Sequence, residues 1–268
     1  MSAKKGRRLC IFCGQPRVTR EHVWPRWLRS IFEDSERVTH EVWSQRPSVP
    51  SASRTWTAKP ISTTAKVVCN SCNGGWMGSL EAENSGLLGA MIQGKPQSLT
   101  QEEQERIALW CVKTGLMLDR VSMPTRIPGD HPGLLFATRR PISHTAIWLT
   151  ACNDQIVAMS HVIKRLAPEL RFSSGTPGNV PLLFGGTGRF KGYLQTMHIG
   201  TFTFQILWSE SRDVVEAVMG WPDSFHHTRI WPTQEVPVSW PKTIIPTDAG
   251  FELFANRIPP PAGHPSTS

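Results

Sequence analysis

The chain has 268 residues, of which 39% are hydrophobic and 19% are charged. This composition suits a globular fold of one large domain or two modest ones and excludes a disordered chain. No run of about 18 apolar residues occurs, so no membrane-spanning helix is expected. Six cysteines are too few for a disulfide-stapled secreted module. No apolar run follows the basic N-terminus, so we expect no signal peptide and a cytoplasmic location.

The net charge of +8 is concentrated at the N-terminus. Residues 1–30 carry eight Lys and Arg side chains and a single acidic residue, Glu21, whereas the rest of the chain is almost neutral. Lys and Arg replace the counterions condensed on phosphates, so nucleic acid is the expected partner. Residues 1–9 are predicted to be a mobile basic arm. For the charges between Lys4 and Arg8, a solubilising tail is the alternative explanation.

The first motif in chain order is a pair of cysteines, Cys10 and Cys13, followed by a short extended segment that carries Glu21 and His22. Residues 24–33 place tryptophan, leucine, isoleucine and phenylalanine at helical spacing, which predicts a short amphipathic helix. Neighbouring side chains on a strand point to opposite faces. Glu21 and His22 could therefore reach one metal ion only if their strand is distorted.

A second pair, Cys69 and Cys72, lies beyond an insertion at 34–65 that is rich in Ser, Thr, Pro and Arg and is interpreted as a loose hairpin. Two Cys-x-x-Cys pairs supply four thiolates, enough to close a tetrahedral structural Zn²⁺ site. A short strand is expected to enter the second pair at 66–69, and a helix is expected over 76–88.

The clearest helix begins at Thr100, because Thr100 and Glu103 form a capping box and apolar residues follow at helical spacing. This stripe is interpreted as a packing face. Cys111 and Cys152 lie in apolar surroundings and are expected to be buried thiols without chemistry. From about residue 130, β-type segments dominate, with predicted strands at 134–138, 146–150, 155–163, 182–184, 194–198 and 202–208.

Beyond these strands, we expect a short helix at 212–219, irregular surface chain at 231–246 and a last helical turn near 251–256. The fold class is therefore α+β, in two parts. Residues 1–92 form the N-terminal zinc module, and residues 93–258 form a β-rich α+β domain of unknown role. Residues 259–268 are predicted to be a disordered tail.

Four polar residues around the cysteines are candidates for catalysis. His22 can act as a general base on water, because its imidazole titrates near neutrality. Glu21 can bind a hard divalent cation, and Glu81 lies where the expected helix would bring it toward the same ion. Asn73 follows the last cysteine, and its amide either caps the next helix or bonds a backbone carbonyl near His22 and so orients the imidazole.

The two cysteine pairs, the run Glu21-His22-Val-Trp-Pro25 and Asn73 together resemble the four-cysteine form of the HNH endonuclease family. The resemblance covers roughly residues 8–85. It implies a treble-clef ββα-metal core with structural zinc, and hydrolysis of DNA, usually double-stranded, with Mg²⁺ or Mn²⁺. It also implies that His22 is the general base, Glu21 a metal ligand and Asn73 the middle Asn. No histidine occurs between His40 and His131, so Glu81 is the candidate for the third position.

Two alternatives belong to other functional classes. A zinc ribbon could bind nucleic acid without cutting it, or the zinc module could be a structural part of a protein-interaction protein. The motif Gly185-Gly-Thr-Gly188 matches no phosphate-binding fingerprint and is best explained as a turn.

Overall fold

The fold is taken from a computed structural model of the chain. The structure describes residues 8–32, 38–46, 49–58, 63–121, 127–153, 159–165, 171–172, 183–184, 191–220, 227–245 and 254–255. The predicted basic arm lies outside the described residues except for its last two positions. The start of the strand predicted at 155–163, the motif at Gly185 and the tail at 259–268 also lie outside them.

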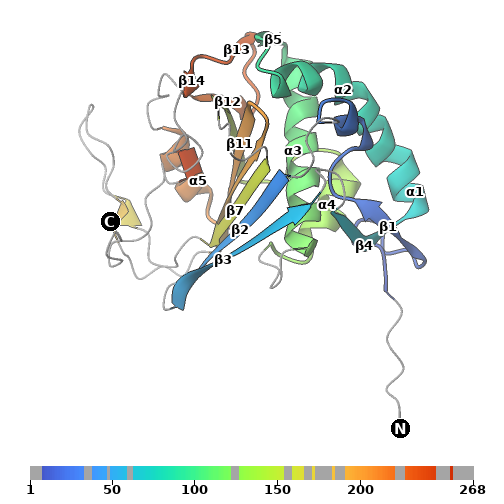
Figure 1. The fold of residues 1–268 in the computed structure, drawn as a ribbon. Helices are drawn as coiled ribbons and strands as arrows, with labels where there is room; N and C mark the ends of the chain where they lie inside the picture. The colour runs from blue at the N-terminus through green and yellow to red at the C-terminus, as the bar shows by residue number, and fades with distance from the viewer. Residues whose placement is uncertain are drawn as a thin grey trace.

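An eight-stranded sheet forms the centre of the described part of the molecule (Figure 1). Its strands follow the order β12–β6–β11–β10–β7–β2–β3, and β14 adds to it by pairing in parallel with β6. The central strands β6, β11 and β10 are buried along almost their whole length, so both faces of the sheet must be covered. The bounds of these strands are β2 (Val38–Arg46), β3 (Val49–Ala58), β6 (Thr145–Cys152), β7 (Met159–Arg165), β10 (Gly192–Ile199), β11 (Phe202–Ser209), β12 (His227–Trp231) and β14 (Ile244–Ile245).

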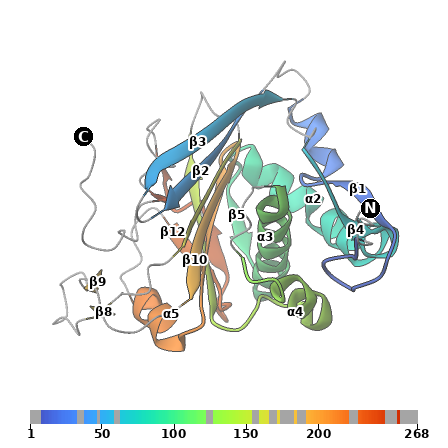
Figure 2. The ribbon, with the colours of Figure 1, turned by 90° about the horizontal axis from the view of Figure 1, so that it is seen from below.

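Helices cover the two faces of this sheet unequally (Figure 2). On one face lies α3 (Gln101–Val121), with α2 (Gly78–Ile92) and α4 (His131–Thr138) beside it. Alternate residues of β11, Phe202, Phe204 and Ile206, belong to the large core on this side. On the other face, α5 (Arg212–Met219) packs Val215 and Val218 into a smaller cluster.

The N-terminal module lies on the far side of α3 from the sheet (Figures 1 and 2). It contains the antiparallel pair of β1 (Val18–His22) and β4 (Thr64–Cys69) and a 3₁₀ turn, η1 (Arg26–Ser30). After β4, the chain passes through α1 (Asn70–Cys72) and a kinked π-helical segment, η2 (Asn73–Met77), into α2. Most of the buried apolar residues of the module, of α3 and of the facing side of the sheet form one continuous core.

The insertion between the two cysteine pairs forms the hairpin of β2 and β3. Strand β2 pairs in parallel with β7, so the hairpin extends the large sheet at its edge. The hairpin expected from the sequence is therefore present, and it joins the N-terminal module to the sheet of the C-terminal part.

The strand predicted at 134–138 is wrong, because this segment belongs to helix α4. A proline lies in the first turn of α4, and Arg139 ends the helix in the left-handed conformation. The apolar run Leu134-Leu-Phe136 is too short for its periodicity to distinguish a helix from a strand.

The prediction of irregular surface chain at 231–246 is also wrong in part. Strand β13 (Val238–Trp240) pairs with β5 (Gln97–Leu99), and β14 pairs with β6. Trp240 is only 1% exposed and donates its indole N–H to the carbonyl of Thr150 at 3.1 Å. A segment rich in proline and tryptophan thus contributes to the core.

Other local predictions are confirmed. The backbone N–H of Thr100 donates to the Glu103 carboxylate at 2.8 Å, and the N–H of Glu103 donates to the Thr100 hydroxyl at 3.3 Å, as a capping box requires. Cys111 and Cys152 are fully buried and form no disulfide. The short pair β8 (Arg171–Phe172) and β9 (Leu183–Phe184) completes the described strands. No helix among the described residues has both the length and the apolar character needed to cross a bilayer.

Candidate metal centre

The first cysteine pair forms a tight knuckle against β4. The N–H of Gly14 donates to the carbonyl of Cys10 at 2.9 Å, and Gly14 has a φ of +72°, which favours glycine. The N–H of Cys10 in turn donates to Gln15, and the N–H of Ile11 donates to Val67 of β4 at 3.0 Å. The last bond holds the knuckle beside the strand that ends at the second cysteine pair.

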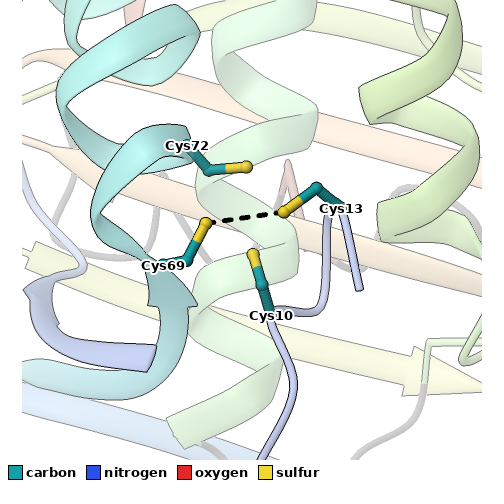
Figure 3. A group of neighbouring side chains, drawn as sticks. All are labelled: Cys10, Cys13, Cys69 and Cys72. Carbon is teal, nitrogen blue, oxygen red and sulfur yellow. Dashed lines mark hydrogen bonds between the residues drawn. The ribbon is translucent and has the colours of Figure 1, made fainter. Parts of the chain in front are cut away.

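The four cysteines converge on one point (Figure 3). Cys69 is the last residue of β4 and Cys72 lies in α1, and the four sulfur atoms lie within 4.8 Å of one another. All four are free thiols. Zinc–sulfur bonds of about 2.3 Å in a tetrahedron require sulfur separations of about 3.8 Å. The cluster thus fits a structural Zn²⁺ ion with small adjustments, and three of its members are buried.

The protein around the cluster shifts the thiol pKa values in opposite directions. Burial opposes ionisation of Cys10, but backbone N–H groups of Cys13, Cys69 and Phe12 outweigh it and lower its pKa to about 7. Burial, together with the neighbouring thiols, raises the pKa of Cys72. Cys10 therefore ionises more readily than Cys72. Thiolates are the form that binds zinc.

The β1–β4 pair places Glu21 and His22 at the end of β1, opposite Ala65 and Thr64. The pairing register shifts by one residue between Thr19 and Glu21. This is the kind of distortion that would be needed to bring two adjacent side chains toward one ion. Both side chains are partly buried.

Charged groups from three further elements act on Glu21 and His22. Burial raises the pKa of Glu21, the charge of Glu81 raises it further, and Arg26 and Lys113 oppose these effects. Burial lowers the pKa of His22, and so do the charges of Arg26 and Arg29 on η1. The end of β1, η1, α2 and α3 thus meet within electrostatic range, and the net effect on the pKa of His22 favours its neutral form, although Glu81 opposes it.

Glu81 forms an ion pair that was not predicted from the sequence. The ammonium of Lys113 on α3 lies 2.7 Å from Glu81 Oε1, and the Lys113 side chain is only 1% exposed, against 24% for Glu81. The available signal was a lysine three residues after Trp110, within the apolar stripe of the predicted helix. Because the stripe was interpreted only as a packing face, the buried Lys113 and its ion pair were not predicted.

Asn73 lies half-buried at the start of the kinked segment, and its backbone carbonyl accepts a hydrogen bond from the N–H of Gly78. Within the described part of the chain, its side chain neither caps a helix nor reaches a carbonyl near His22. The buried Nδ1 of His22 is likewise without a partner in that part of the chain. The orienting role of Asn73 stays a prediction.

Comparison of the chain with models of known protein families, with curated proteins and with solved structures finds no match.

Proposed function

We propose that this protein is a divalent-metal-dependent endonuclease of the HNH type that hydrolyses phosphodiester bonds of DNA. The observation that carries the proposal is the convergence of four cysteine sulfurs, which tie the strand bearing Glu21 and His22 to the strand and helices that lead to Glu81. A knuckle, an antiparallel strand pair and a following helix are the parts of a treble clef, and their presence supports the proposal that the module belongs to that class.

In the proposed mechanism, His22 accepts a proton from the attacking water. Burial and the charges of Arg26 and Arg29 support this role, because they lower the pKa of the imidazole and so favour the neutral form that can accept a proton. Glu21 and Glu81 would hold the divalent ion, since their mutual repulsion is what a cation at this position would relieve. The ion would supply positive charge opposite the scissile phosphate and its leaving oxygen.

Exposed basic side chains support DNA as the partner. Arg20 on β1 and Lys66 on β4 are exposed, as are Arg26 and Arg29 of η1, next to the candidate centre. Each phosphate contact made by such a side chain should add about −0.9 to the slope of log affinity against log salt concentration.

The direct test is cleavage of plasmid DNA with Mg²⁺ or Mn²⁺. We expect His22→Ala to lower the rate by about 10²–10⁴-fold, because a general base is lost. The matched control is His144→Ala, which removes an exposed histidine that contacts the backbone of Glu210 and should leave the rate unchanged. Zinc content and melting temperature should be unaltered in both variants.

Three results would count against the proposal. DNA binding without cleavage by any of the proteins would favour the zinc-ribbon alternative. No affinity for DNA at low salt would favour a structural zinc module. Equal loss of activity in both histidine variants would remove His22 from the mechanism.

A further inference from the structure

Lys113 is an ammonium buried beside the proposed catalytic centre. Its side chain is 1% exposed, its Nζ lies 2.7 Å from Glu81 Oε1, and it lies 5.7 Å from the centre of the Trp110 ring. A buried lysine is costly unless it has a charged partner. Glu81, at the boundary with solvent, provides that partner, so this ion pair links α2 to α3.

The pair changes the charge available to a metal ion. Glu21 and Glu81 together carry two negative charges, but Lys113 cancels one of them and occupies one oxygen of Glu81. Lys113 belongs to α3, which lies between the module and the sheet (Figures 1 and 2), and its side chain is buried, whereas Arg26 on η1 is exposed. Because the Lys113 side chain is buried, it has less freedom than the exposed Arg26 to move away from the carboxylates.

A buried amide lies on α2, the helix that carries Glu81. Asn84, one turn after Glu81, is fully buried and donates to the carbonyl of Leu80 at 2.8 Å. Its Oδ1 has no hydrogen-bond partner among the described residues. Helix α2 therefore buries an amide on its core-facing side as well as carrying Glu81.

We propose that Lys113 is a built-in counter-ion that competes with the divalent metal for Glu81, so that the centre binds one metal ion weakly and mainly through Glu21. This inference rests on the proposed function for its biological meaning. Lys113 acts through Glu81 and is too buried to contact substrate, so it is a positioning residue and not a catalytic one.

The test is the affinity of the zinc-loaded full-length protein for Mn²⁺ alone, measured from the electron paramagnetic resonance signal of free Mn²⁺. Mn²⁺ should not displace zinc from the four thiolates, because it binds soft ligands less well. We expect Lys113→Met to tighten Mn²⁺ binding at least tenfold, because two uncompensated carboxylates then face the ion. Lys113→Arg, which keeps the charge, should bind Mn²⁺ as the wild type does.

Further variants separate charge from packing. Glu81→Gln in the wild-type background should weaken Mn²⁺ binding less than Glu21→Gln, which should abolish it, because Lys113 already competes for the Glu81 carboxylate. The double variant Lys113→Met with Glu81→Gln should return to the wild-type affinity. If Lys113→Met does not fold, Lys113→Gln removes the charge while keeping an N–H donor for Glu81, and the same tightening is expected.

The outcomes distinguish this inference from the proposed function. Binding of Mn²⁺ by the wild type without tightening in Lys113→Met overturns the inference alone. Binding that occurs only in Lys113→Met supports the inference and overturns a metal-dependent nuclease. Absence of Mn²⁺ binding in both the wild type and Lys113→Met overturns both this inference and the proposed function.

Discussion

His131 begins helix α4 with its ring buried against aromatic side chains. It is 2% exposed, and its ring centroid lies 4.4 Å from that of Trp208 in an edge-on contact and 5.9 Å from that of Tyr193. Burial lowers the pKa of His131 to about 4, Arg120 lowers it too, and Asp130 partly opposes them. At neutral pH this residue is an uncharged aromatic group in the core.

The buried histidine predicts how stability depends on pH. In the unfolded chain His131 binds a proton near pH 6.5, whereas in the folded protein it does so only near pH 4. The free energy of unfolding should therefore be fully maintained above pH 6.5 and fall by about 1 kcal/mol per pH unit below it, toward pH 4. Urea titrations at several pH values measure this slope.

The control is His131→Phe, which keeps an aromatic ring beside Trp208 and removes the titrating group. Between about pH 6.5 and pH 5, the slope of its unfolding free energy against pH should be smaller than in the wild type. The difference should correspond to the uptake of close to one proton on unfolding. Equal slopes in the two proteins would show that His131 is protonated in the fold or does not control this dependence.

At the scale of elements, the turn between β10 and β11 contacts helix α2. Gly200 in this turn has a φ of +57°, and a Cβ added there would lie 2.6 Å from the carbonyl oxygen of Ile92. The same carbonyl accepts a hydrogen bond from the N–H of Thr201 at 2.9 Å. The central hairpin of the sheet and the end of α2 thus touch backbone to backbone.

We expect Gly200→Ala to destabilise the protein by about 1–3 kcal/mol, because the left-handed conformation and the contact with backbone both disfavour a side chain. The measurement is the midpoint of chemical unfolding. Gly86→Ala is the matched control, since a Cβ at Gly86 in the middle of α2 meets nothing within 4 Å. That change should stabilise by about 0.5–1 kcal/mol, and a loss of similar size in both variants would contradict the prediction.

How well each element could be predicted depended on how local its signal is. Helix α3 was predictable, because its capping box and apolar stripe are written in neighbouring residues. Helix α4 was not, because Leu134-Leu-Phe136 suits a buried strand as well as a buried helix. Strand β13 was missed because its partner β5 lies far away in the sequence.

At the scale of the whole molecule, the candidate zinc cluster joins segments separated by the β2–β3 hairpin. Removing the metal should release four thiols and loosen the knuckle from β4. We expect chelation to lower the melting temperature by on the order of 10 °C or more, because metal binding is part of the folding free energy of such modules. Scanning calorimetry with and without chelator measures the change.

Variants of single cysteines provide the matched comparison. Cys72→Ser should lose bound zinc and melt like the chelated protein, whereas Cys152→Ala, at a buried thiol outside the cluster, should retain one zinc per chain. Purified protein without zinc, or a melting temperature that does not change on chelation, would contradict a structural Zn²⁺ ion at the four cysteines.

The sequence by itself determined the four cysteines of the cluster, the capped helix α3 and the α+β character, because each depends on residue spacing along a short stretch of chain. Only the tertiary structure decided that the insertion joins the large sheet through β7 and that Lys113 pairs with Glu81. Periodicity identifies which face of an element is buried but not what covers it. A partner from a distant segment is selected by the packing of the whole core, and that selection placed a lysine beside the proposed catalytic carboxylates.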